Sequence, residues 1–120
     1  MKDYDNFFLP VRNLEQGKQF YAQILGLQIK FDFPNLGMAA FKVGRQEPAI
    51  ILSSRPNSKP AIWFTVDDVQ EMFGKLKAKG VEFLAEPFVI KTGVAAEFED
   101  PFGNRLGITD YSTATHISFK

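Results

Sequence analysis

Few residues of this 120-residue chain could carry out acid–base or nucleophilic chemistry. The chain has no Cys, which excludes disulfides, thiolate nucleophiles and sulfur-ligated zinc. Its one His, His116, lies beyond the last predicted strand, where we expect an exposed tail residue. Glu97, Glu99 or Asp100 could act as the base of a cofactor-free isomerase. Glu97 and Glu99 flank Phe98 in a predicted strand, however, and we expect both to point to solvent or to a second copy of the chain.

Aromatic side chains and one Arg are the other candidate functional groups. Phe occurs 13 times, more than a core of this size needs, which indicates that some Phe side chains line a cavity. Because Ile62 and Phe64 are expected to face a helix, we predict that Trp63, the only Trp, lies in a ligand pocket rather than in the core. Arg105 could orient an anionic or carbonyl-bearing ligand, or be simply a solvated charge after a turn. The other aromatic residues predicted to contact a ligand, each of which could instead belong to the core, are Phe8, Phe33, Phe41, Phe98 and Phe102.

The overall composition limits the partners of the chain. Lys plus Arg and Asp plus Glu cancel at 14 each, and no window gathers enough basic residues for a phosphate backbone, so we expect no nucleic-acid partner. No apolar run approaches the roughly 20 residues of a membrane span, and the N-terminus lacks the layout of a signal peptide. We therefore expect no membrane association and a cytoplasmic location. A chain of this length is expected to form a single domain, residues 1–120, around one core.

The residue pattern predicts one strand-helix-strands unit that occurs twice. In the first copy, a strand leads into a helix that Asn13 caps, that runs to about Leu25 and that Gly26 ends. Residues 54–60, rich in Ser, Pro and Asn, indicate a linker after this copy. The predicted strands of the first copy are residues 7–11, 27–33, 38–43 and 49–53.

The second copy repeats these signals at an offset of about 55 residues. Asp67 or Asp68 caps its helix, and Gly80 ends it. Its predicted strands include residues 62–66, a strand that opens at 81–83, residues 93–96, and residues 106–108 after a turn at 100–104. The repeat indicates an internal duplication with module one at about 5–54, module two at about 60–111 and a tail at 112–120.

Several short motifs occur in an order and spacing that resemble a known family. They are Val-Arg-Asn-Leu at 11–14, Phe-Tyr at 20–21, Leu-Gly-Leu at 25–27, Thr-Val-Asp-Asp-Val at 65–69, Lys-Gly-Val at 79–81 and Asp-Pro-Phe-Gly-Asn at 100–104. On these motifs, nearly the whole chain resembles the vicinal oxygen chelate superfamily, which contains glyoxalase I, the fosfomycin- and bleomycin-resistance proteins and the extradiol dioxygenases. The resemblance implies an α+β fold in which two βαβββ modules form a curved eight-stranded mixed sheet around a cavity, with helices on the convex face. It also implies a homodimer.

The resemblance directs attention to four positions at which the metal-dependent members bind a metal. Those members place one His, Gln or Glu on each of four strands, so that a divalent cation binds adjacent oxygens of the substrate. Matched by motif, the positions are Asn6, Ile51, Ala61 and Gly107. Three of these side chains have no donor atom, and the neutral amide of Asn6 is a weak ligand. We therefore predict no metal and no other cofactor, which argues against glyoxalase and dioxygenase activity.

These observations favour a metal-free small-molecule-binding protein, which would sequester an aromatic or antibiotic-like compound and would need no catalytic residue. Asn6 and Ile51 join Trp63, Arg105 and the aromatic side chains as predicted ligand contacts. Residues 9–12 are similar to the first strand of the metal-free bleomycin-binding members, but zero net charge does not suit a cationic drug. The alternatives are a lyase, isomerase or dioxygenase of the same superfamily with unorthodox catalytic residues, and a degenerate module whose pocket is filled and which pairs with another protein.

Overall fold

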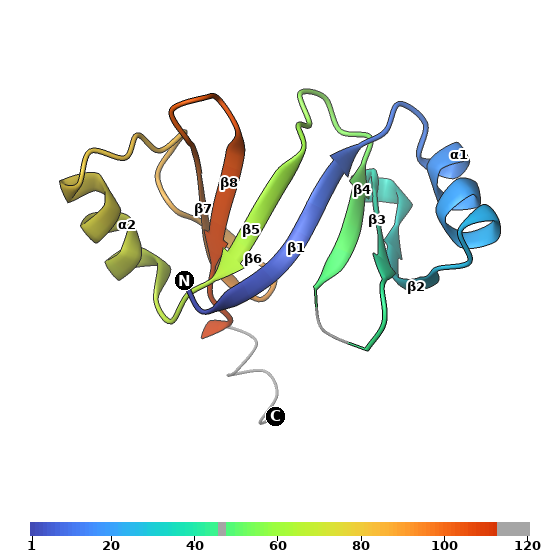
Figure 1. The fold of residues 1–120 in the computed structure, drawn as a ribbon, viewed down its shortest axis with the longest axis horizontal. Coiled ribbons are helices and arrows are strands. Elements are labelled where there is room, and N and C mark those ends of the chain that lie inside the picture. Colours follow the sequence, from blue (N-terminus) through green and yellow to red (C-terminus); the bar gives the residue numbers. More distant parts are fainter. Residues whose placement is uncertain (46–47, 113–120) are drawn as a thin grey trace. The chain divides into compact units, whose positions relative to one another are not determined.

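The computed structural model describes residues 1–45 and 48–112 and shows an α+β fold of two βαβββ modules (Figure 1). The first module is Asp5–Ala61, and the second combines Ile62–Lys120 with the N-terminal residues Met1–Tyr4. The predicted fold class, with one unit occurring twice, is confirmed. His116 lies outside the described residues.

The first module contains four strands beside one helix. Its elements in chain order are β1 (Asp3–Pro10), α1 (Leu14–Gln19), the π-helical segment η1 (Phe20–Ile24), β2 (Gln28–Phe33), the 3-10 turn η2 (Pro34–Leu36), β3 (Met38–Lys42) and β4 (Ala49–Ser53). The strand order is β2-β3-β4-β1, in which β1 runs parallel to β4 and the other neighbours are antiparallel. Three of these strands were predicted from the sequence within one residue, whereas β1 begins four residues before its predicted start at Phe7.

The second module repeats this plan with one unexpected strand. Its elements are β5 (Ala61–Thr65), α2 (Val69–Ala78), β6 (Phe88–Ile90), β7 (Gly93–Glu99) and β8 (Arg105–Thr109), in the strand order β5-β8-β7-β6. The strand predicted to open at 81–83 is reduced to a single bridge between Phe83 and Phe98. Pro87 has no N–H to donate, so pairing with β7 resumes only at β6, which the sequence did not predict.

Side-chain caps start both helices at the predicted residues. Asn13 Oδ1 accepts a hydrogen bond from the Gln16 N–H at 3.0 Å, and Asp68 Oδ1 accepts one from the Glu71 N–H at 3.1 Å. These bonds satisfy N–H groups that have no partner within the helix. The predicted cap Asn13 is therefore confirmed, and of the two candidates Asp67 and Asp68 it is Asp68 that caps the second helix.

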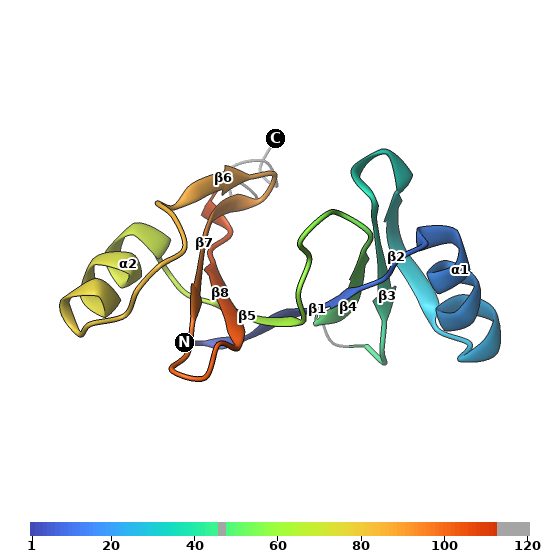
Figure 2. The same cartoon turned by 90° about the horizontal axis from the view of Figure 1, so that it is seen from above.

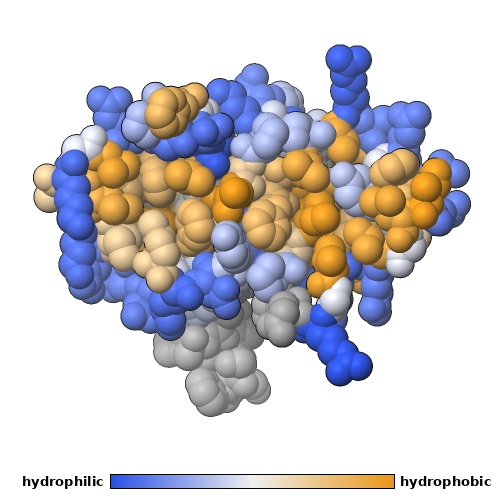
Figure 3. All heavy atoms as spheres, in the orientation of Figure 1, coloured by the Kyte–Doolittle hydropathy of each residue, from blue (hydrophilic) through white to orange (hydrophobic). Residues whose placement is uncertain are grey.

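The helix of the first module is shorter and less regular than predicted. The α-helix ends at Gln19 and continues as η1, in which the Leu25 N–H bonds to the Phe20 carbonyl at 3.0 Å, before Gly26 leaves the helix with a φ of 74°. Phe20, Ile24 and Leu25 are exposed, and apolar side chains gather over this end of the module in Figure 3. Among the described residues, no helix combines the length and apolar character that crossing a membrane requires.

Each helix packs against one face of the strands of its own module (Figure 2). In the first module the fully buried Phe41 and Leu52 form the centre of this packing, and Tyr21 lies against the Phe41 ring at 5.7 Å between centroids. In the second module Val69 of α2 and Ile108 of β8 are fully buried where the helix packs on the strands. We call the opposite face of the strands in each module its helix-free face.

Asp110 joins three parts of the second module immediately after β8. Its carboxylate is almost fully buried and accepts hydrogen bonds from the Val69 N–H at 2.9 Å, the Val94 N–H at 3.0 Å and the Ser112 hydroxyl at 2.8 Å. Val69 begins α2 and Val94 lies in β7, so one side chain fixes the start of the helix to the sheet. Gly93 leaves room for this carboxylate, because a Cβ there would lie 2.5 Å from Asp110 Oδ1.

Candidate functional site

The helix-free face of the second module carries the polar side chains that are best suited to bind a ligand or to transfer a proton. Phe98 and Ile108 face α2. Their strand neighbours therefore point the other way, because side chains alternate along a strand. The residues placed on the helix-free face in this way are Trp63 from β5, Glu97 and Glu99 from β7, and Arg105 and Gly107 from β8.

Trp63 lies directly over Gly107. A Cβ built on Gly107 would overlap the indole Nε1 and would lie 2.5 Å from Cδ1 and 2.6 Å from Cε2 of the same ring. Trp63 is only 8% exposed, so the ring is held in a well-packed position. The predicted orientation of Trp63, away from α2, is thus the observed one. The absence of a side chain at Gly107 is what allows the ring to lie there.

The Glu97 carboxylate accepts a hydrogen bond from the indole N–H of Trp63. In the pairing of β7 with β8, Glu97 lies opposite Gly107. Trp63 Nε1, which can only donate, lies 3.3 Å from Glu97 Oε2. The sequence analysis expected Glu97 to point to solvent or to a second copy of the chain, whereas its partly buried carboxylate lies against Trp63 of the same module. Sequence alternation predicted its face, but nothing in the sequence indicated that a residue 34 positions away would contact it.

Arg105 lies two residues before Gly107 on β8 and points to the same face. It pairs with Glu99 across the two strands, and its Nη2 lies 3.5 Å from Glu99 Oε2. The Arg105 side chain is 18% exposed, so it is not the solvated charge that was one of its two expected roles. Its Nε is buried and has no hydrogen-bond partner among the described residues. A buried donor without a partner loses its hydration without compensation, which makes Arg105 Nε the most unusual polar atom of this face.

Two of the predicted aromatic contacts lie elsewhere. Phe41 and Phe98 belong to the helix-facing cores of the first and second modules, where Phe41 is 0% and Phe98 is 7% exposed. The prediction that these two side chains contact a ligand is therefore wrong, because each strand turns this position toward the helix of its own module. Phe102 is 87% exposed in the turn before β8.

The first module has an apolar helix-free face that includes three predicted contacts. Phe8 and Ile51 pack in one cluster there, together with Phe31, which the sequence analysis missed. Phe33 stacks on Phe31 with 4.8 Å between centroids and 21° between ring planes. Phe31 and Phe33 lie two residues apart and share one face of β2, whereas a bulge between Ile29 and Phe31 separates both from Ile29, which pairs with the helix-facing Phe41.

The residues at the four metal positions do not fit a metal. The Asn6 amide is already used, because its Nδ2 donates to Asp5 Oδ2 at 2.7 Å and its Oδ1 accepts from the Ala49 N–H at 3.3 Å. Ile51 and Ala61 are apolar and buried, and the space beside Gly107 is filled by an indole. Across residues 1–45 and 48–112, no group of three or more His, Cys, Asp or Glu side chains could hold a metal ion.

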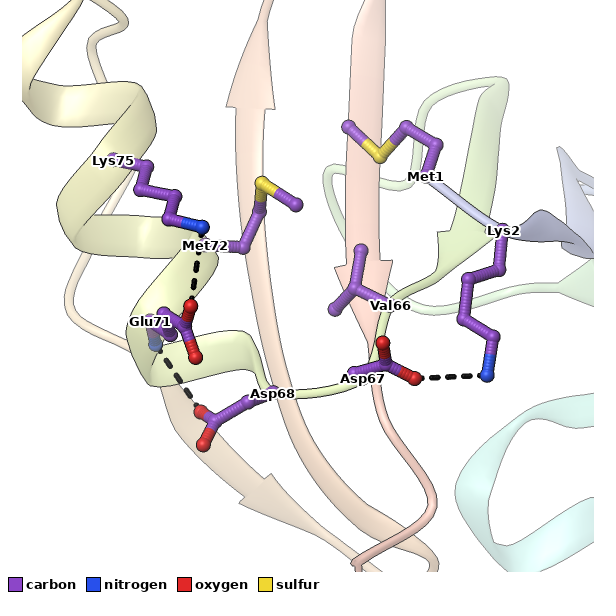
Figure 4. Close-up of a pocket in the computed structure, with 8 residues that line it drawn as sticks. All are labelled: Met1, Lys2, Val66, Asp67, Asp68, Glu71, Met72 and Lys75. Carbon is purple, nitrogen blue, oxygen red and sulfur yellow. Dashed lines mark hydrogen bonds and ion pairs between the residues drawn. The ribbon is translucent and has the colours of Figure 1, made fainter.

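A surface pocket at the start of α2 is a weaker candidate. Figure 4 shows that its charged side chains pair with one another: Lys2 Nζ lies 2.8 Å from Asp67 Oδ1, and Lys75 Nζ lies 3.1 Å from Glu71 Oε1. The hydrogen bond between Lys2 and Asp67 raises the pKa of Lys2 and lowers the pKa of Asp67. The remaining lining residues are Met1, Val66, Asp68 and Met72, and Asp68 is the helix cap. The polar groups here are engaged in holding the helix start.

Similarity to known proteins agrees with the fold described above. The protein YetH of Bacillus subtilis (strain 168), described as uncharacterized, is 28% identical over 103 residues, which cover 78% of this chain and 86% of YetH. Methylmalonyl-CoA epimerase from Mycobacterium tuberculosis superposes with a TM-score of 0.75 at 16% identity, covering 96% of this chain and 91% of the epimerase. For a protein from Legionella pneumophila described as NAD-dependent benzaldehyde dehydrogenase, the TM-score is 0.73 at 19% identity, covering 89% and 98%.

These structural similarities indicate the fold alone, whereas a sequence profile indicates the family. The profile of the Glyoxalase/Bleomycin resistance protein/Dioxygenase superfamily matches residues 4–108, which is most of the chain and includes both modules. The chain therefore belongs to the glyoxalase/bleomycin resistance protein/dioxygenase superfamily.

Proposed function

We propose that this chain binds a small, partly aromatic molecule without a metal ion, and that it does so on the helix-free face of the second module. One observation carries the proposal. The Trp63 ring covers Gly107, the position at which metal-dependent relatives carry a ligand side chain, and donates a hydrogen bond to Glu97. An aromatic ring and a hydrogen-bonded carboxylate thus occupy the place of a metal ligand.

The composition of this face supports small-molecule binding. Ligand sites combine apolar or aromatic surface with a few fixed polar groups, and here one indole lies beside Glu97 and the Glu99–Arg105 pair. The Trp63–Glu97 bond and the strand pairing hold these groups in place before a ligand arrives. A preformed arrangement of this kind lowers the entropic cost of binding.

The proposal predicts that ligands change the fluorescence of Trp63, the only Trp. We expect a saturable change with some members of a library of aromatic metabolites, and no stoichiometric binding of Ni²⁺, Mn²⁺ or Zn²⁺ by calorimetry. Trp63→Phe, which keeps an aromatic ring but loses the N–H donor, should weaken calorimetric ligand binding by about tenfold. A flat fluorescence response across the library, or stoichiometric metal binding that Asn6→Ala abolishes, would contradict the proposal.

A cofactor-free isomerase is the second candidate, and Glu97 is the observation in its favour. This carboxylate is partly buried and oriented by the indole of Trp63, which is how a general base is positioned. Glu99 is a poorer choice because it pairs with Arg105. The fold that this chain shares with methylmalonyl-CoA epimerases makes a proton transfer next to a thioester carbonyl the natural reaction to test.

The two candidates predict different results in D₂O. A binding protein should not accelerate deuterium incorporation at the acidic C–H of methylmalonyl-CoA. An isomerase should do so, and Glu97→Gln should then lower the exchange rate by roughly 10²- to 10⁴-fold, whereas Glu99→Gln should change it much less. Mass spectrometry of the thioester measures the exchange directly.

A further inference from the structure

We propose that Arg105 recognises a carboxylate group of the bound molecule, so that the ligand is a planar aromatic carboxylate that also carries a hydrogen-bond donor. This inference rests on the proposed binding function and specifies its ligand class. It starts from the buried Nε of Arg105, which has no partner among the described residues.

The guanidinium of Arg105 is only partly used. An Arg presents five N–H donors in a planar fork, and a carboxylate can accept from two of them side by side. Nη2 makes a long contact, 3.5 Å from Glu99 Oε2, and Nε has no partner among the described residues. Because Nε is covered in the free protein, a carboxylate would reach this edge only when the atoms over it move aside, and it would then complete the pairing of a group that is four-fifths buried. Most of the desolvation of the Arg105 side chain therefore takes place on folding, before the ligand binds.

The position of Arg105 on β8 defines what else the ligand must carry. Arg105 and Gly107 share one face of the strand about 7 Å apart, because alternate residues of a strand are separated by two rises of about 3.4 Å. Trp63 covers Gly107 and its indole reaches Glu97. A flat molecule lying along this row would place its carboxylate at Arg105, its ring beside Trp63 and a donor group near the Glu97 carboxylate.

The local charges favour a carboxylate over a phosphate. Glu97 and Glu99 lie on the same face as Arg105, so the three groups sum to a net negative charge. A dianionic phosphate would be repelled by both carboxylates, whereas a monoanion in the Nε edge keeps its charge close to the cation and further from Glu97. Planarity also matches, because a carboxylate lies in the plane of the fork.

The turn before β8 holds Arg105 in this position. Asp100 Oδ1 accepts hydrogen bonds from the Phe102 N–H at 2.8 Å and the Asn104 N–H at 2.9 Å, and Asp100 Oδ2 accepts one from Asn104 Nδ2 at 2.8 Å. These bonds lower the pKa of Asp100, first through the Asn104 side chain, and so keep it ionised. These hydrogen bonds hold Asn104, the residue immediately before Arg105, and so position the backbone at the start of β8.

The test uses 4-hydroxybenzoate, whose carboxylate and hydroxyl lie at opposite ends of one ring. We expect saturable binding by calorimetry, at least about tenfold weaker binding of its methyl ester, and weaker binding of phenyl phosphate. In ¹⁵N-resolved NMR spectra, the Nε–H signal of Arg105 should shift on addition of 4-hydroxybenzoate. Arg105→Lys keeps the charge but loses the fork, and should weaken binding by at least about tenfold.

Arg55→Lys is the matched control, because Arg55 is exposed and lies in the first module. It should leave the affinity for 4-hydroxybenzoate unchanged. If Trp63 fluorescence responds to neutral aromatic compounds while the ester binds as well as the acid, the carboxylate inference is wrong and the proposed binding function stands. If no compound of either kind binds, both are wrong. Should Arg105→Lys fail to fold, the Arg105 Nε–H shift in the wild-type protein still decides the inference.

Discussion

Gly107→Ala is expected to lower the free energy of unfolding by about 1–3 kcal/mol, because the new methyl group has no space. Its Cβ would overlap Trp63 Nε1 and lie 2.5 Å from Cδ1, well inside the contact distance of two heavy atoms. Trp63 is 8% exposed and held by Glu97, so the ring cannot simply rotate into water. Denaturant unfolding of the two proteins measures the difference.

A control and a rescue make this prediction specific. Gly74 lies inside α2 with open space where its Cβ would be, so Gly74→Ala should raise the free energy of unfolding by about 0.5–1 kcal/mol. Trp63→Phe should recover part of the loss in the Gly107→Ala background, because a smaller ring leaves room for the methyl group. If Gly107→Ala has the same free energy of unfolding as the wild type, the indole of Trp63 does not lie over this glycine. The statement that Trp63 fills the position of a metal ligand would then be wrong.

Asp110→Asn is expected to cost about 3 kcal/mol of stability at neutral pH, because the carboxylate serves several buried donors at once. The N–H groups of Val69 and Val94 and the hydroxyl of Ser112 all donate to it. An Asn side chain offers one acceptor oxygen in place of two and turns an NH₂ group toward a backbone N–H. The start of α2 and the edge of β7 would then compete for one oxygen.

The same carboxylate should make stability depend on pH. Burial alone would raise the pKa of Asp110, but the hydrogen bonds from Val69, Val94 and Ser112 outweigh burial and hold the pKa below its usual value. A depressed folded-state pKa contributes stability above the unfolded-state pKa of about 3.9, and this contribution is lost as the pH falls through the folded-state pKa. The stability difference between wild type and Asp110→Asn should thus be constant from about pH 5 to 7 and shrink below about pH 4.

Denaturant unfolding between pH 3 and pH 7 tests both parts of this prediction. Asp67→Asn is the matched control, since the Asp67 side chain is 84% exposed and pairs with Lys2 at the surface. It should change stability little, because exposed ion pairs contribute little. A stability difference between wild type and Asp110→Asn that is small, or that grows as the pH falls below 4, would show that the carboxylate is not held as described.

Local signals in the sequence were sufficient for the helix starts and for most of the strands, whereas the resemblance to a family supplied the arrangement of the sheet. The caps at Asn13 and Asp68 and the turn at 100–104 depend on residues within four positions of one another, so they can be read directly from the chain. Alternation along β5 and β8 likewise predicted which face carries Trp63 and Arg105. Prediction failed where alternation was not applied, as at Phe41 and Phe98, which face the helices, and at Phe31, which shares a face with Phe33 but was not among the predicted contacts.

Contacts between distant residues were decided only by the tertiary structure. No local pattern shows that Trp63 covers Gly107, that Glu97 accepts its N–H, that Asp110 caps α2 through Val69, or that the Nε of Arg105 is buried without a partner. Each of these depends on which residues meet when separate strands pair and a helix packs on them. Side-chain alternation is a property of one strand, whereas register and packing are properties of the assembled sheet. The sequence by itself therefore determined the family, the modules and the lack of metal-binding side chains, and the tertiary structure determined which groups form the site.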